Sequence, residues 1–197
     1  MLTTPHARAQ TAPPPLEDRA QALECLTLAV AYEAGYESPE GQQAVAEVVL
    51  NRVRHPAFPK SVCGVVFAGS TLKTGCQFTF TCDGSLRRHL PDKVMTQARG
   101  IAEQVIDGRL TPVVGDALNY HADYVSPYWA PSLDRVTKIG AHIFYRRRGS
   151  TPAIAALSFA GTMPAARPAA FAPGAAPAPA FAPWGLAPRA PAEAAQP

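Results

Sequence analysis

The sequence lacks any run that approaches the roughly 18 consecutive apolar residues of a membrane-spanning helix. It also lacks a strong charge of either sign, because its net charge at pH 7 is only +3. So small an excess does not indicate nucleic acid as a partner, although it is compatible with an anionic cell-wall polymer. We therefore expect a soluble protein with no membrane span and no nucleic-acid partner.

No Cys-x-x-Cys pair occurs among the four cysteines, so neither a zinc ribbon nor a thioredoxin-type motif is predicted. The stretch CQFTFTC places Cys76 and Cys82 on either side of residues typical of β-strands. We expect disulfides and favour Cys76–Cys82 as a local pair, with Cys25 and Cys63 completing an even set. The sequence leaves three pairings open, and four separate buried thiols are the alternative. Disulfides would imply export from the cytoplasm.

The composition changes near both ends of the chain. Residues 1–15 are Pro-rich and polar, and alanine and proline supply 24 of the 37 residues from 161 to 197. Such segments cannot bury enough apolar surface to offset the entropy that is lost on ordering. We expect a folded domain over residues 16–150, between a disordered segment at 1–15 and a disordered, spacer-like tail at 151–197.

Helical spacing of apolar residues marks three segments inside this domain. The first helix is expected over residues 16–34, with Gly35 ending it in a left-handed conformation. Ser38 as N-cap and Pro39 as first helical residue begin the second helix. A third helix is expected over residues 91–108, where the apolar residues keep helical spacing.

Shorter segments indicate a minor sheet. The FTFT run inside CQFTFTC consists of strand-forming residues, and residues 142–146 are expected to form a closing strand. The predicted fold class is α+β, a mostly helical domain with a small β-sheet.

One residue breaks the apolar pattern of the first helix. Leu23, Leu26 and Val30 recur on one face, and three residues further along that face lies Glu33. Burial and the negative end of the helix dipole both raise the pKa of a carboxyl group in that place. A carboxyl that stays protonated near neutral pH suits a general acid acting on a glycosidic oxygen. The alternative is a structural Glu33 that reaches solvent or forms a salt bridge.

Other acidic residues have simpler explanations. Glu37 is expected to pair or cap near the second helix, and Glu40 to complement the dipole of that helix. Asp83 precedes Gly84 in a predicted turn, where aspartate makes local hydrogen bonds. No second carboxylate is therefore evident for a glycosidase mechanism that uses a pair.

Three stretches together are similar to a known family. They are CLTLAVAYEAGYESPEGQQAVAEVVLNRVRHPAFPKSVCGVVF, CQFTFTCDG and NYHADYVSPYWAPSLDRVTKIGAHIFYR, within residues 23–146. They resemble the cell wall hydrolases related to spore cortex-lytic enzymes. The resemblance implies a lysozyme-like fold and lytic transglycosylase activity on the glycan strands of peptidoglycan, and we expect a monomer without cofactor or metal. Glu33 matches the family's catalytic glutamate, whereas Gly35 stands where the family usually has arginine.

The first residues, MLTTPHARAQTAPPP, have no apolar segment of the kind found in signal peptides. The run HARAQ is nevertheless similar to the end at which such leaders are cleaved. We expect that a leader was removed or lies upstream. A periplasmic or secreted location is thus inferred from the cysteines and the family, not from a visible signal.

Polar and aromatic residues of the later stretches are the predicted sugar-binding groups. Amide groups bond to sugar hydroxyl and acetamido groups, and rings stack on sugar faces. If FTFT is a strand, Gln77 and Thr79 point to one side and Phe78 to the other. For each candidate, burial in the core is the alternative. The candidates are Gln77, Phe78, Thr79, Tyr120, His121, Tyr128 and Trp129.

Two other functions remain open. A zinc amidase would need three protein ligands, and His121 with Asp123 supplies only a pair without a third ligand of recognisable spacing. A non-catalytic wall-binding module is the second, with the three arginines at 146–148 as a patch for an anionic polymer. Glu33 favours the transglycosylase, because a binding module has no use for a buried carboxylic acid.

Overall fold

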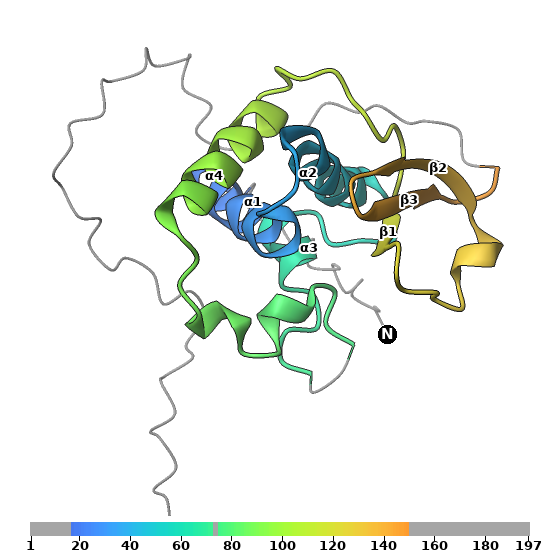
Figure 1. The fold of residues 1–197 in the computed structure, drawn as a ribbon, viewed down its shortest axis with the longest axis horizontal. Coiled ribbons are helices and arrows are strands. Elements are labelled where there is room, and N and C mark those ends of the chain that lie inside the picture. Colours follow the sequence, from blue (N-terminus) through green and yellow to red (C-terminus); the bar gives the residue numbers. More distant parts are fainter. Residues whose placement is uncertain (1–16, 73–74, 150–197) are drawn as a thin grey trace, which may run out of the picture. The chain divides into compact units, whose positions relative to one another are not determined.

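The computed structural model describes residues 17–72 and 75–149. The predicted disordered segments at 1–15 and 151–197 lie outside these residues. The described residues form helices and one small sheet (Figure 1), which confirms the mostly helical α+β class. In chain order the elements are α1 (Arg19–Ala34), α2 (Pro39–Arg54), α3 (Val62–Val66), the 3-10 helices η1 (Thr79–Thr81) and η2 (Ser85–Arg87), α4 (Asp92–Ile106), β1 (Asn119–Ala122), the 3-10 helix η3 (Ala130–Ser132), β2 (Asp134–Ile139) and β3 (His142–Arg146).

The helical core surrounds α1. This helix begins at Arg19, about three residues later than predicted, after an extended Asp18. It packs against α2, α3 and α4. The predicted inward residues of α4 are all buried in this core, and they are Val94, Ala98, Ile101 and Val105. No helix in the described part of the chain is both long and apolar enough to cross a bilayer.

The turn between α1 and α2 differs from the prediction at Gly35. Its φ of −59° and ψ of −23° are right-handed, so the predicted left-handed conformation is wrong. A Cβ atom at Gly35 would lie 2.3 Å from the Ala31 carbonyl oxygen and 2.6 Å from Val94 Cγ1. Glycine is required here because a Cβ atom would clash both with the α1 backbone at Ala31 and with Val94 of α4, not because the backbone is left-handed.

The beginning of α2 is as predicted. Ser38 is the N-cap, and its Oγ accepts a hydrogen bond from Gly41 N at 3.2 Å. Pro39 is the first helical residue, where its missing N–H costs nothing.

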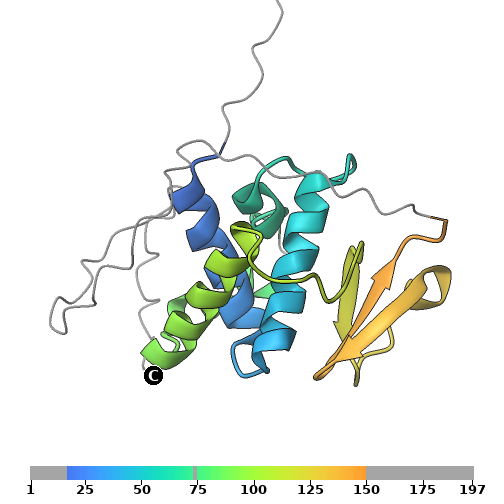
Figure 2. The same ribbon diagram turned by 90° about the horizontal axis from the view of Figure 1, so that it is seen from above.

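The whole stretch 41–50 of α2 is buried. One face of the helix packs in the α1 core, while Ala44 and Val48 pack against Ile139 and Phe144 of the sheet. Figure 2 shows α2 between the other long helices and the sheet. Because α2 is covered on both sides, it joins the two parts of the domain.

The CQFTFTC stretch does not form the predicted strand. Thr79–Thr81 is a 3-10 helix, in which the Thr81 hydroxyl donates to the Phe78 carbonyl at 2.7 Å. Strand-forming residues need a neighbouring strand, and among the described residues the sheet consists of β1, β2 and β3 alone. Phe78 and Phe80 are buried all the same, so the predicted alternation of sides holds without a strand.

The sheet is antiparallel, with strand order β1-β3-β2. The predicted closing strand is confirmed as β3 and lies in the centre. The turn from β2 to β3 contains Gly140 at φ +56°, a conformation that favours glycine. A Cβ atom there would also lie 1.8 Å from Glu37 Oε2, so the α1–α2 turn touches this hairpin.

Both disulfides are present, and the favoured pair is confirmed. Cys76 is bonded to Cys82, and Cys25 to Cys63. The Cys25–Cys63 bond connects α1 to α3 across a sequence separation of 38 residues. It therefore fixes the segment after α2 against the central helix.

Candidate active site

Glu33 lies in the last turn of α1, on the face that the apolar spacing indicated. Leu23, Leu26 and Val30 on this face are at most 5% exposed, whereas Glu33 is partly buried. The carboxyl group therefore sits where the core meets the surface. In that position it loses much of its solvation but remains accessible.

Tyr120 on β1 holds this carboxyl group. Its hydroxyl donates a hydrogen bond to Glu33 Oε2 at 3.1 Å. The Tyr120 ring lies edge-on to His142, with centroids 5.2 Å apart, and against Phe144 at 5.6 Å. Two residues of β3 thus fix the orientation of the tyrosine.

The pKa of Glu33 is raised, as the sequence predicted. Burial is the largest cause, because it disfavours the charged form. The hydrogen bond from Tyr120 and the positive charge of Arg52 lower this pKa, while the negative charge of Asp83 raises it. The net result is a carboxyl group that keeps its proton to higher pH than an ordinary glutamate.

Arg52 is a part of the site that sequence reasoning missed. It is only 4% exposed, and its Nε donates to the Leu118 carbonyl at 2.8 Å, two residues before Tyr120. Its guanidinium lies over the rings of Phe58 and Phe78, 5.6 and 5.4 Å from their centroids. An arginine near the end of a helix normally reaches solvent, so its burial here gives no signal in the sequence.

Phe78 does not offer a ring for sugar stacking. It is 2% exposed and packs beneath the Arg52 guanidinium and beside Phe80. The alternative of a core residue is therefore correct for this position. Its neighbours Gln77 and Thr79 are exposed, and their roles in binding stay predictions.

Glu33 opens onto a hollow of about 410 Å³ at the end of α1. Its walls are residues 31–37 on one side and residues 88–91 on the other. The Tyr32 hydroxyl donates to the Arg88 carbonyl at 2.8 Å and joins these walls. Pockets for small ligands have volumes of about 300 to 1,000 Å³, so this hollow has the size of a binding site.

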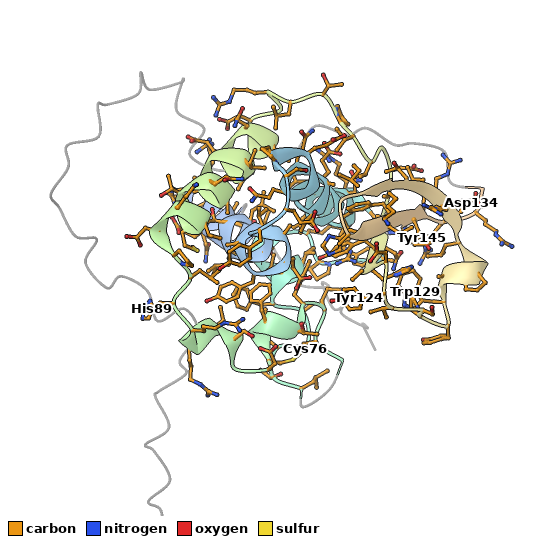
Figure 3. The ribbon with its side chains drawn as sticks, in the orientation of Figure 1. Cys76, His89, Tyr124, Trp129, Asp134 and Tyr145 are labelled. Atoms are coloured by element: carbon orange, nitrogen blue, oxygen red, sulfur yellow. A yellow bond between two sulfur atoms is a disulfide. The ribbon has the colours of Figure 1, made fainter. Side chains whose placement is uncertain are left out.

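The other aromatic candidates gather on the sheet. His121 Nε2 lies 3.0 Å from the Tyr145 hydroxyl, and Trp129 packs edge-on against both of these residues. Figure 3 shows Trp129 and Tyr145 together at the sheet, well away from His89 in the wall of the hollow. Tyr128 is 95% exposed. Of the predicted sugar-binding residues, the structure brings Tyr120 to Glu33 but not His121, Tyr128 or Trp129.

His121 and Asp123, the pair considered for a zinc site, each contact another side chain. Asp123 forms a salt bridge with Lys138 at 2.7 Å, and His121 is held by Tyr145. Within residues 17–72 and 75–149, no three His, Cys, Asp or Glu side chains converge in a metal-binding arrangement. The geometry of the described residues thus gives no support to the amidase alternative.

The arginines at the end of β3 are balanced by acidic groups. Arg146 and Arg148 lie 4.0 and 3.6 Å from the carboxylate of Asp134. Arg148 also donates to the Pro131 carbonyl at 2.7 Å. Such pairing does not favour the predicted patch for an anionic polymer.

The remaining carboxylates near the hollow have local partners. Glu37 Oε1 accepts from Ala141 N at 3.2 Å and lies 3.5 Å from His142 Nδ1. Asp83 Oδ1 accepts from Ser85 N at 2.7 Å, in the predicted turn. Asp83 has the local contact that the sequence indicated, whereas Glu37 contacts the β2–β3 hairpin and does not pair with or cap the second helix as predicted.

Comparison with known proteins places this arrangement in a family. The family model described as Cell Wall Hydrolase matches residues 36–145, a range that begins three residues after Glu33. The spore cortex-lytic enzymes of Halalkalibacterium halodurans and Bacillus subtilis are each 33% identical over 122 residues. The aligned part is 62% of this chain and 34% and 36% of those proteins, so the chain spans about a third of their length.

Two solved structures have the same arrangement of helices and sheet. The catalytic domain of the Bacillus cereus SleB protein is 28% identical with a TM-score of 0.54, covering 71% of this chain and 100% of that one. The catalytic domain of the germination-specific lytic transglycosylase SleB from Bacillus anthracis is 31% identical with a TM-score of 0.52. That match covers 64% of this chain and 93% of the other. With its family model matched over more than half of its length, the chain belongs to the cell wall hydrolase family.

Proposed function

We propose that this domain cleaves the glycan strands of peptidoglycan as a lytic transglycosylase, with Glu33 as its acid and base. The observation that carries the proposal is the Glu33 carboxyl group, which has a raised pKa, a hydrogen bond from Tyr120 and an open hollow beside it. The names of the relatives support the substrate, since they are spore cortex-lytic enzymes and a lytic transglycosylase. A substrate in the cell wall and two disulfides fit a location in the bacterial envelope.

The reaction needs one group that alternates between two protonation states. Glu33 first gives its proton to the glycosidic oxygen, and the bond from this oxygen to C1 of muramic acid breaks with its electron pair on the oxygen. The Glu33 carboxylate then takes the proton of the C6 hydroxyl of the same sugar as that oxygen attacks C1. The product is a 1,6-anhydro sugar, and Glu33 is again protonated.

The surroundings of Glu33 suit both steps. Burial favours the protonated acid that begins the reaction. The Tyr120 hydroxyl and the positive charge of Arg52 favour the carboxylate that completes it. These effects oppose one another, so each of the two protonation states has surroundings that stabilise it, which suits a group acting as acid and then base.

A nucleophile from the substrate also explains why one acid suffices. Hydrolysis by inversion or retention uses a second carboxylate near the scissile bond. In the part of the chain that the structure describes, Glu37 and Asp83 are the acidic residues near Glu33, and both accept hydrogen bonds from backbone N–H groups. The C6 hydroxyl of muramic acid removes the need for such a partner.

Mass spectrometry of digested peptidoglycan tests the proposal. The expected products are anhydromuropeptides, each lighter by one water than the hydrolytic product. Reducing-end muramic acid alone would contradict the proposal and make Asp83 the first candidate for a second carboxylate. Free stem peptides would indicate the amidase, and binding without any product would indicate a wall-binding module.

A further inference from the structure

Arg88 lies in the wall of the hollow that faces Glu33. Its backbone is fixed on both sides, because its carbonyl accepts from the Tyr32 hydroxyl at 2.8 Å and its N–H donates to the Ser85 carbonyl at 2.9 Å. Tyr32 directly precedes Glu33 on α1 and also stacks on Phe80, with centroids 5.0 Å apart. These contacts hold Arg88 in a defined place relative to the proposed acid.

The Arg88 side chain is exposed, and its charge acts on Asp83 only from beyond salt-bridge distance. Its Nη2 makes one contact, with Ser85 Oγ at 3.4 Å. Among the described residues, no carboxylate oxygen lies within 4.0 Å of its guanidinium. Arg19, Arg99, Arg109, Arg146 and Arg148 do have such partners, whereas among the described residues the exposed Arg87 and Arg135 resemble Arg88 in having none. Arg88 therefore remains available to a ligand.

The charges of the hollow leave room for an anion. Of the described residues in its walls, Arg88 alone carries a permanent positive charge, and the following residue, His89, which is labelled in Figure 3, adds a second basic side chain. Glu33 has a raised pKa because it is buried, and Glu37 Oε1 accepts a hydrogen bond from Ala141 N. Gly35 adds no side chain, since Ala31 and Val94 leave no space for a Cβ atom.

We propose that Arg88 forms a carboxylate-binding subsite that places the muramic acid unit of the glycan against Glu33. The inference rests on the proposed function, which supplies a muramyl substrate. The sugars of a glycan strand alternate, and the carboxylates belong to the muramic acid units alone. They are the lactyl carboxylate where no peptide is attached, and the carboxylates of the stem peptide where one is. A guanidinium binds a carboxylate through two parallel hydrogen bonds, which fix orientation as well as position.

This subsite gives Arg88 a role in the register of the strand. The anhydro product requires the C6 hydroxyl and C1 of the same muramic acid to face Glu33. A strand displaced by one sugar would present N-acetylglucosamine instead and would leave the Arg88 guanidinium without a carboxylate. Binding at Arg88 therefore selects the productive position among alternating sugars.

The test measures binding in a variant that does not turn over. Calorimetry compares Glu33→Gln with Glu33→Gln/Arg88→Ala on three ligands: peptide-bearing glycan fragments, amidase-trimmed fragments with free lactyl groups, and fragments whose carboxylates are converted to amides. We expect Arg88→Ala to weaken binding of carboxylate-bearing fragments about tenfold, the effect of one hydrogen bond between charged groups. Binding of the amidated fragments should be unchanged. Arg88→Lys should retain part of the affinity, because it keeps the charge without the bidentate geometry.

Arg135 supplies the matched control. It is an exposed arginine on β2 and does not line the hollow, so Arg135→Ala should leave all three affinities unchanged. A loss with trimmed fragments would identify the lactyl carboxylate as the ligand, and a loss with peptide-bearing fragments alone would identify the stem peptide. Either result supports the subsite. An equal loss on charged and amidated fragments, or no loss on charged ones, would overturn it.

The binding result is independent of the proposed reaction. If the wild-type protein forms no anhydro product but Arg88→Ala still weakens binding of carboxylate-bearing fragments, the reaction is refuted and the subsite stands. If anhydro products form while Arg88→Ala binds every fragment normally, the reaction stands and the subsite is refuted.

Discussion

The Tyr120 hydroxyl donates a hydrogen bond to Glu33 Oε2 at 3.1 Å, across 87 positions of the sequence. This contact joins the sheet to the end of α1, so the state of the proposed acid depends on how the sheet is held. Buried polar groups of α2 hold the segment that leads into β1. Glu47 Oε2 accepts from Val113 N and Val114 N at 2.9 and 3.0 Å, and Arg52 donates to the Leu118 carbonyl. The geometry at Glu33 is thus set partly by residues that do not touch it.

Replacing Glu33 with glutamine tests the acid directly. The amide keeps the shape of the side chain but has no proton to transfer. We expect the fold to survive and glycan cleavage to fall by at least about 100-fold, which is typical for the loss of a general acid. Release of soluble muropeptides gives the rate, and circular dichroism reports the fold. Glu40→Gln is the matched control, because Glu40 is exposed in the first turn of α2. Near wild-type cleavage by folded Glu33→Gln would sink the assignment.

Tyr120→Phe should change the pH dependence of cleavage. The Tyr120 hydrogen bond lowers the pKa of Glu33, whereas burial, the larger effect, raises it. Removing the hydroxyl leaves burial in place, so the pKa of Glu33 should rise further. Because the first step needs protonated Glu33, the alkaline limb of kcat/KM should move to higher pH. Rates on soluble glycan fragments across a pH series measure this limb.

A second tyrosine separates this effect from a general one. Tyr124 is 85% exposed, and Tyr124→Phe removes a hydroxyl without altering the contacts of Glu33. The alkaline limb of kcat/KM for Tyr124→Phe should match that of the wild type. If the limb of Tyr120→Phe stays in place or moves to lower pH, the hydrogen bond does not tune the acid as inferred.

The sequence predicted best those features that depend on local spacing. Ser38 and Pro39 mark the start of α2 because capping and the fixed φ of proline act within a few residues. The position of Glu33 on the inward face of α1 was predicted because a carboxylate interrupts a regular apolar spacing. The closing strand, β3, has the bounds that were predicted from its own residues.

The features that were missed depend on distant neighbours. A Cβ atom at Gly35 would clash with Ala31 of its own helix and also with Val94 of α4, and this second clash comes from a residue more than fifty positions later. Arg52 looks like a surface residue until Phe58 and Phe78 cover it. The FTFT run has strand propensity, but a strand forms only where another strand is available, and here a disulfide closes the segment instead.

The two disulfides should differ in their contribution to stability. The loop-closure model assigns about 4 kcal/mol to a bond that closes a loop like that of Cys25–Cys63, and about 2 kcal/mol to one like Cys76–Cys82. The sequence separations are 38 and 6 residues. Replacing the first pair with alanines should therefore lower the free energy of unfolding more than replacing the second. Urea denaturation of both double variants measures the difference. A larger loss from the Cys76–Cys82 pair would contradict the loop-closure argument.

Gly35→Ala should destabilise the domain through clashes with the α1 backbone and with α4. The new Cβ atom would lie 2.6 Å from Val94 Cγ1 and 2.3 Å from the Ala31 carbonyl oxygen. Overpacking of this kind costs about 1 to 3 kcal/mol. Shortening Val94 relieves one of the two clashes, so Gly35→Ala/Val94→Ala should lose less stability than the sum of the single variants. Gly100→Ala in α4 is the control: a Cβ atom there meets nothing within 4 Å, and alanine favours the helix by about 1 kcal/mol. Urea denaturation of the four variants and the wild type decides the matter, since strict additivity would mean that positions 35 and 94 do not compete for space.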